Sequence, residues 1–238
     1  MEPLEPGDTD SSRLRMRGPK LTDRDVEIIR WITRHGVVTA DLVGRRFFWR
    51  PQLQAYGRRA TYRRLNALCR LGLILDKKEY GTPHNVIRTT RVGARLADVG
   101  VRPAPFVLSE LQHTLAVVAL GEYLLHENPG AELTTERELR VERLKQTLAS
   151  TREHGRGRVP DAVLRLRPDA RGVRESIAVE LDLTRKDQRT IEHIIGQFAF
   201  ETFDRVWWYV RPVRVERMQT IVRALHADQR VEVRPWHG

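Results

Sequence analysis

The stretch from Val159 to Lys186 constrains the fold of this chain more than any other. It reads VPDAVLRLRPDARGVRESIAVELDLTRK, and two runs rich in Val, Leu and Ile flank a Pro-Asp-Ala-Arg-Gly segment that is typical of a turn. The spacing predicts a β-hairpin in which Ala162 faces Val179. This register keeps one face of the hairpin apolar, whereas a slip by one residue would mix the two faces.

Three carboxylates lie on the opposite face of the same hairpin. In the predicted register Asp161 stands directly across from Glu180, and Asp182 follows two residues later on the same side. Facing residues have Cβ atoms roughly 5 Å apart, and carboxylates this close raise one another's pKa unless a cation neutralises them. Mg²⁺ binds such oxygen ligands, so these acids are candidate metal ligands, with Mn²⁺ as a substitute ion. The alternative is an ordinary hairpin whose acids face water.

A Pro-Asp pair, a spacer and the triplet Glu-Leu-Asp inside an apolar strand together resemble the core of the PD-(D/E)XK nucleases. The resemblance implies that Asp161 and Glu180 bind a metal ion, and that a lysine two residues after the second acid helps to activate water. Asp182 occupies that lysine position, and the nearest lysine, Lys186, reaches the site only if the chain turns after the strand. His113 is a further candidate for proton transfer, although a histidine beside an apolar stripe is commonly a packing residue.

The positive charge of the chain is concentrated in its first half. The chain has 238 residues and a formal net charge of +11, and residues 20–102 alone hold 18 basic and 7 acidic residues. A basic module joined to a nearly neutral one predicts that the first binds a polyanion, most often nucleic acid. The single cysteine rules out a disulfide framework and suits the cytoplasm, and the lack of a long apolar run argues against a membrane span.

The basic module has the pattern of three helices followed by a hairpin. Residues 1–19 are rich in Pro, Gly, Ser and Asp, which predicts a disordered tail. Thr22 and Thr39 are suited to begin the first two helices. A linker is expected over 49–57 and a third helix over 58–71. The runs LGLILDKKE and NVIRTT then predict two paired strands.

The third helix separates into a buried stripe and a basic face. Thr61, Leu65 and Leu68 are spaced as one side of a helix, so the arginines lie on the other side. Three helices and a hairpin predict a winged helix-turn-helix, with the arginine helix in the major groove of double-stranded DNA. The alternative is a protein-interaction module with a solvated arginine face. The candidate DNA-binding residues are Arg58, Arg59, Tyr62, Arg63, Asn66 and Arg70 on the helix and Lys77, Lys78, His84 and Arg88 on the wing.

Residues 103–238 predict a second module, of α/β class (α+β for the chain overall). The boundary is expected at Pro103 and Pro105, and Ser109 is the expected N-cap of the helix that follows. The expected elements are a helix over 109–126, a strand over 132–140, a basic loop over 150–158, the hairpin, a helix over 186–203, a strand over 205–210, a helix over 213–226 and a strand over 230–234. This order matches the αβββαβ arrangement of the restriction-endonuclease-like fold. Trp207 and Trp208 are expected in its core.

The chain from about Lys20 to its end resembles the replication-relaxation family of bacterial plasmid and mobile-element proteins. The resemblance is carried by LTDRDVEIIRWI in the winged helix, by QHTL in the helix near residue 112, and by VPD and VELD in the hairpin. It implies DNA binding linked to plasmid replication, mobilisation or DNA relaxation on a nuclease-like fold. It also implies replication or conjugation proteins as partners.

Two functions follow from these patterns. The first is a DNA-binding protein whose second module cleaves phosphodiesters with Mg²⁺ held by the hairpin acids, assisted by Lys186 or His113. The second is a non-catalytic transcriptional regulator or replication accessory factor whose C-terminal module forms a homodimer or contacts a partner. Under either function, the protein is expected to be cytoplasmic, to bind DNA and not to associate with a membrane.

Overall fold

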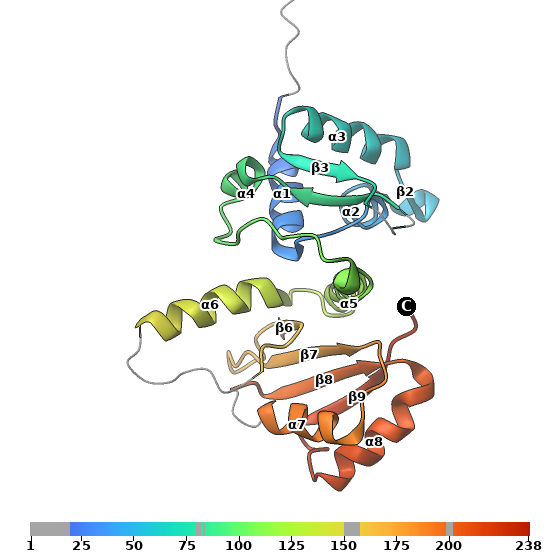
Figure 1. Cartoon of the computed structure of the whole chain (residues 1–238), viewed down its shortest axis with the longest axis vertical. Coiled ribbons are helices and arrows are strands. Elements are labelled where there is room, and N and C mark those ends of the chain that lie inside the picture. The colour runs from blue at the N-terminus through green and yellow to red at the C-terminus, as the bar shows by residue number, and fades with distance from the viewer. Residues whose placement is uncertain (1–19, 80–81, 83, 150–157, 199–201) are drawn as a thin grey trace, which may run out of the picture.

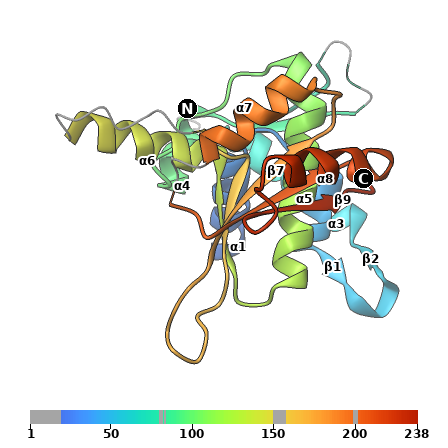
Figure 2. The same cartoon turned by 90° about the horizontal axis from the view of Figure 1, so that it is seen from below.

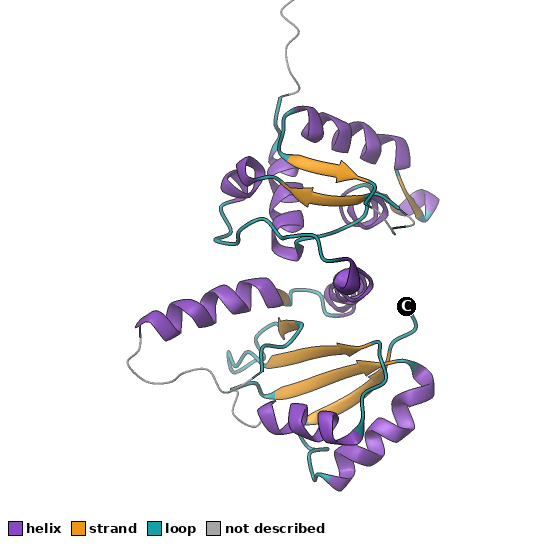
Figure 3. Cartoon of the chain, in the orientation of Figure 1, coloured by secondary structure: helices purple, strands orange, loops and turns teal. Residues whose placement is uncertain are grey.

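The computed structural model describes residues 20–79, 82, 84–149, 158–198 and 202–238. The expected tail over 1–19 and all but the last residue of the basic loop over 150–158 lie outside these ranges. The described chain mixes helices and strands, and helix α5 (Leu111–Glu127) lies between an N-terminal module and a C-terminal sheet (Figures 1 and 3). Within the described ranges, no helix combines the length and the apolarity needed to cross a membrane.

The N-terminal module is built on three helices whose ends agree with the capping residues of the sequence. They are α1 (Asp23–His35), α2 (Ala40–Phe47) and α3 (Arg58–Arg70). The Asp25 carboxylate accepts hydrogen bonds from both the N–H and the hydroxyl of Thr22 at the start of α1. The Thr39 hydroxyl accepts the Leu42 N–H at the start of α2. Gly72 ends α3 at φ 68°, a left-handed conformation that glycine adopts readily.

Two short hairpins complete this module. β3 (Ile74–Lys77) and β4 (Val86–Thr89) pair antiparallel, as the sequence predicts, and α4 (Arg91–Ala97) follows them. The expected linker over 49–57 contains a second hairpin, β1 (Trp49–Arg50) and β2 (Ala55–Tyr56), which projects from the molecule in Figure 2. A 3-10 turn (Pro51–Leu53) and a left-handed Gln54 reverse the chain between the two strands. Strands of two residues are too short for alternation to predict them.

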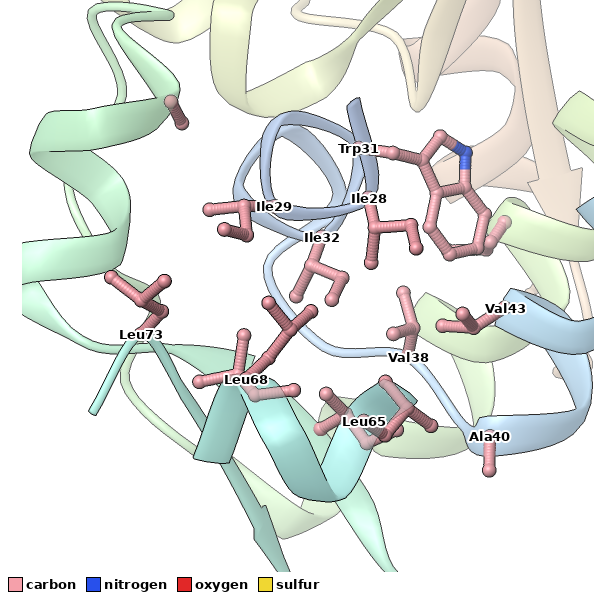
Figure 4. Close-up of a cluster of buried hydrophobic side chains, with 14 residues drawn as sticks. Ile28, Ile29, Trp31, Ile32, Val38, Ala40, Val43, Leu65, Leu68 and Leu73 are labelled. Carbon is pink, nitrogen blue, oxygen red and sulfur yellow. The ribbon is translucent and has the colours of Figure 1, made fainter. Parts of the chain in front are cut away.

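An apolar core joins α1 to α3 (Figure 4). Ile28, Ile29 and Ile32 of α1 are fully buried in one cluster with Leu65 and Leu68 of α3. Burying each such side chain stabilises the fold by about 1.5–3 kcal/mol. Because the apolar stripe of α3 faces this core, most of its arginines are left on the outside.

The C-terminal module is a five-stranded sheet with helices on both faces (Figure 1). Its strands, in order across the sheet, are β5 (Glu132–Thr135), β6 (Ala162–Arg165), β7 (Ser176–Asp182), β8 (Arg205–Val210) and β9 (Val231–Pro235). The first three are antiparallel and the last three are parallel. The further helices are α6 (Glu136–Ala149), α7 (Gln188–Phe198) and α8 (Val215–Ala224), with 3-10 turns over Leu108–Glu110 and Pro212–Arg214.

The register predicted for the β6–β7 hairpin is confirmed. Ala162 pairs with Val179, and the apolar face that contains them packs against α5. The other face packs against α7 and α8, so the sheet is covered on both sides. Trp207 and Trp208 are 5% and 1% exposed, which confirms that they are core residues.

The structure corrects two expected boundaries. The strand expected over 132–140 ends at Thr135, and α6 begins at the next residue. Glu138 accepts hydrogen bonds from the N–H and the hydroxyl of Thr135, each 2.9 Å long. This is a capping box, which the Thr-x-x-Glu spacing could have indicated. Ser109 is not an N-cap, because it lies inside a 3-10 turn and α5 begins at Leu111.

Helix α5 ties the two modules together. Val118 belongs to the core of the N-terminal module, whereas Leu120 packs in the core beneath the sheet. On the same helix, Glu122 accepts a hydrogen bond from Trp31 Nε1 at 3.0 Å and forms an ion pair with Arg46 at 3.1 Å. The two modules therefore share side-chain contacts on both sides of α5.

Candidate nucleic-acid interface and acidic site

Helix α3 presents a basic face to the exterior of the N-terminal module. Its buried residues include Thr61, Leu65 and Leu68, on the side that meets the core. Among the described residues, none of the exposed arginines of α3 forms an ion pair with a carboxylate. All six helix residues predicted to contact DNA are exposed, namely Arg58, Arg59, Tyr62, Arg63, Asn66 and Arg70.

The charges of α3 are unfavourable for the helix itself. The helix contains five arginines and no acid, and Arg58 and Arg59 occupy its first turn. The helix dipole disfavours cations at that end by about 0.3–1 kcal/mol each, and arginines one turn apart repel each other. The basic face of α3 is therefore not explained by the stability of the helix itself.

Arg64 differs from the other arginines of α3 because it is structural. Its guanidinium pairs with Asp25, which is 1% exposed, and donates to the Lys20 carbonyl oxygen at 2.9 Å. Burial raises the pKa of Asp25, but hydrogen bonds from Arg64 and Thr22 outweigh burial and hold the pKa below its usual value. Arg64 thus fastens α3 to the start of α1.

The residues predicted to lie on a wing fall into two groups. Lys77, Lys78 and His84 are exposed, as a wing that contacts DNA requires. Arg88 instead pairs with Glu79 at 2.7 Å and lies 5.5 Å from the centre of the Phe106 ring, with its side chain 17% exposed. Its guanidinium is already engaged, so we assign Arg88 to holding the β3–β4 hairpin against the segment that leads to α5.

The acidic site begins just before β6. One oxygen of Asp161 lies 3.0 Å from Nε2 of His113 on α5, and the other accepts the Leu181 N–H at 2.8 Å. The hydrogen bond to Asp161 raises the pKa of His113, and burial opposes this only in part. The structure therefore brings two of the predicted site residues together as an imidazole–carboxylate pair.

Glu180 is buried in β7 and is held by an arginine that the sequence did not single out. Both of its oxygens accept hydrogen bonds from Arg158, at 3.0 Å from Nε and 3.2 Å from Nη2. Burial and the neighbouring Asp161 raise the pKa of Glu180 to about 8, against the opposing effect of Arg158. Arg158 is one of many arginines in the chain, so nothing in its local pattern marked it as a partner of Glu180.

Lys186 forms an ion pair with Asp182, the residue that stands where the nuclease motif has its lysine. The chain turns directly after β7 and places Lys186 Nζ 2.8 Å from Asp182 Oδ1. Arg214 holds this turn by donating to the carbonyl oxygens of Thr184 and Asp182. Asp182 is 2% exposed, and its Oδ2 has no hydrogen-bond partner in the part of the chain that the structure describes. The turn that the lysine needs is therefore present.

Basic side chains accompany all three acids of the predicted magnesium site. Each carboxylate has a partner of its own: His113 for Asp161, Arg158 for Glu180 and Lys186 for Asp182. Arg158 and Lys186 reduce the mutual repulsion of the acids, as does His113 when its imidazole is protonated. Over the described ranges, no group of three or more His, Cys, Asp or Glu side chains could hold a metal.

A cavity of about 160 Å³ lies between the two modules beside the acidic site. His35, Val118, Arg137 and Asp161 are among its lining residues, together with His113. Burial, with the charges of nearby arginines, lowers the pKa of His35 to about 3, so this imidazole is neutral at pH 7. The lining of the cavity thus contains both a neutral histidine and the His113–Asp161 pair.

Comparisons of the chain with protein-family models, with curated proteins and with solved structures found no match. The resemblance to the replication-relaxation family stays a prediction from the sequence. The assignment of a function accordingly rests on the geometry of α3 and of the acidic site.

Proposed function

We propose that this chain is a DNA-binding protein whose N-terminal module docks on double-stranded DNA as a winged helix, with α3 in the major groove. The observation that carries the proposal is the exposed face of α3, where arginines that form no ion pair with any described residue flank Tyr62 and Asn66. Arginine guanidinium groups bind phosphates and guanine edges in a fork, and asparagine binds adenine. Lys77 and Lys78 lie on the hairpin that forms the wing, where they can contact neighbouring phosphates.

The sequence resemblance supplies the setting of this proposal. It implies a protein of a plasmid or mobile element that acts in replication, mobilisation or DNA relaxation with replication or conjugation proteins. The C-terminal module is then a restriction-endonuclease-like domain that serves as an accessory or dimerising platform. This role is favoured by Arg158, which engages both oxygens of Glu180, a residue that a nuclease would use for its metal.

The test is the binding of labelled duplex DNA, followed by fluorescence anisotropy as salt rises from about 50 to 200 mM. Arg59→Ala and Arg63→Ala are each expected to weaken binding and to reduce the slope of log K against log salt by about one, because each loses one phosphate contact. Arg95→Ala removes an exposed arginine of α4 and is the matched control. Equal binding and equal slopes in all four proteins would contradict the proposal.

A second candidate is Mg²⁺-dependent cleavage of DNA at the acidic site. The observation that favours it is Lys186, which folds back to 2.8 Å from Asp182 and so supplies a lysine near the predicted metal ligands. Supercoiled DNA would be incubated with Mg²⁺ or Mn²⁺ and the wild type, Asp161→Ala or Glu180→Ala. Nicking by the wild type alone would establish a nuclease, and binding without nicking by all three would favour the accessory role.

A further inference from the structure

A second basic surface adjoins the arginine face of α3. It is a concavity of about 980 Å³ that is lined by the start of α1, the end of α2, β1 and α3. Its lining includes Arg24 from α1, Arg50 from β1, and Arg63 and Arg70 from α3. We call this concavity the arginine groove.

The arginine groove keeps its positive charge because few carboxylates neutralise it. Its lining holds five arginines and two acids, Asp23 and Asp25. Asp25 is 1% exposed and is already paired with Arg64. Among the described residues, the other four arginines form no ion pair. Unpaired guanidinium groups around a concave surface attract and bind phosphate groups.

An aromatic side chain stands beside these arginines. Trp49 of β1 is 49% exposed, whereas Trp31, Trp207 and Trp208 are at most 6% exposed. Phe48 also lines the groove and packs against the core of the module. Surfaces that bind single-stranded nucleic acid combine these two features, with cations for the backbone and exposed aromatic rings for stacking with bases.

The hairpin that carries Trp49 is anchored to α2. Tyr56 pairs with Trp49 across the two strands, and its hydroxyl donates a hydrogen bond to Asp41. The Tyr56 ring fills the space beside Gly44, where an added Cβ would lie 2.2 Å from the ring. Trp49 is therefore presented from a hairpin whose place beside α2 is determined by packing.

We propose that the arginine groove binds an unpaired strand of DNA, with phosphates on its arginines and a base stacked on Trp49. Paired bases hide their faces in the stack and offer only their edges, so an exposed indole favours an unpaired base. Arg63 and Arg70 belong both to the groove and to the exposed face of α3, so the unpaired strand leaves the duplex beside this helix. The path of the strand from the duplex into the groove rests on the proposed duplex binding by α3, whereas binding of a single strand in the groove does not.

The experiment compares three DNA probes: a blunt duplex, the same duplex with a single-stranded tail of about ten nucleotides, and oligothymidine alone. The wild type is expected to bind the tailed duplex about tenfold more tightly than the blunt one, which corresponds to about 1.4 kcal/mol. Trp49→Ala should lose this preference, and Trp49→Phe should keep most of it. Leu53→Ala is the matched control, because Leu53 is 65% exposed on the same hairpin but does not line the groove.

Two further readouts address the hairpin itself. Tail binding should quench the tryptophan emission of the wild type and should quench that of Trp49→Phe much less. Gly44→Ala places a Cβ against Tyr56 and displaces the hairpin, so it should reduce the preference for a tail while Trp49 is still present.

The outcomes separate this inference from the proposed duplex docking. Trp49-dependent binding of oligothymidine without any duplex binding would support the groove and refute the docking. Equal affinity of the wild type for blunt and tailed duplexes would overturn the proposal that the groove binds an unpaired strand. An unchanged preference of Trp49→Ala for the tailed duplex would overturn it as well. A lower sedimenting mass of Trp49→Ala than of the wild type would also overturn it, by showing that the hairpin is an interface between copies of the chain.

Discussion

Two histidines that line one cavity have their pKa moved in opposite directions. His35 is buried beside arginines and its pKa falls to about 3, whereas the hydrogen bond to Asp161 raises the pKa of His113. The difference comes from the surroundings of each ring, because burial dominates at His35, whereas the hydrogen bond to Asp161 outweighs burial at His113. Each histidine therefore makes stability depend on pH, but with opposite sign.

The first prediction concerns acid stability. The folded pKa of His35 is below its ordinary value of 6.5, so its contribution to stability is present above pH 6.5 and is lost as pH falls toward 3. The loss has a limiting slope of about 1.4 kcal/mol per pH unit. Urea unfolding between about pH 6.5 and 5 should show a shallower pH dependence for His35→Gln than for the wild type. Parallel curves for the two proteins would contradict this assignment.

Helix α3 shows how one element carries two kinds of arginine. Arg63 is exposed and unpaired among the described residues, whereas the next residue, Arg64, turns inward to the buried carboxylate of Asp25. Successive helix positions lie about 100° apart, so neighbours in the sequence face different surroundings. Exchanging the two roles would require the whole helix to rotate.

The second prediction separates these roles. Arg64→Ala leaves the buried Asp25 carboxylate without its main partner and should lower the free energy of unfolding by about 2–3 kcal/mol. Arg63→Ala should change it by less than about 0.5 kcal/mol, as is usual for exposed positions, and should weaken DNA binding instead. Urea unfolding and anisotropy on the same two proteins provide the measurement. A reversal of the two effects would show that the roles are misassigned.

Helix α5 connects the two modules of the molecule through their apolar cores. Residues of this helix take part in the core of the N-terminal module and in the core beneath the sheet, and Arg34 of α1 pairs with Glu138 of α6 at 2.7 Å. A helix shared by two cores couples their stabilities, because neither core can lose it alone. The position of α3 relative to the acidic site is therefore held by packed elements.

The third prediction concerns this coupling. Val118→Ala removes a side chain that is 1% exposed in the N-terminal core and should lower stability by about 2 kcal/mol. Because α5 also packs on the sheet, far-ultraviolet circular dichroism and tryptophan emission should shift to lower denaturant together. Separate transitions for the two probes in the wild type would show that the modules unfold independently.

Local sequence signals were sufficient to predict most of the helices and strands. Thr22 and Thr39 begin the first two helices, and Gly72 ends the third, as their capping preferences predict. The β1–β2 hairpin and α6 were missed for different reasons. The strands of the hairpin are too short to show alternation. The charged sequence of α6 shows little helical periodicity, and its capping box is the one local signal that indicates a helix.

By itself, the sequence determined the register that sets Asp161 opposite Glu180 and the helix face that gathers the arginines of α3. Both follow from the periodicity of a single element. Only the tertiary structure decided which basic side chain meets each acid. His113 comes from α5, Arg158 from the segment before β6 and Lys186 from the turn after β7. Periodicity determines the side of an element on which a residue lies, whereas its neighbour there depends on how separate elements pack.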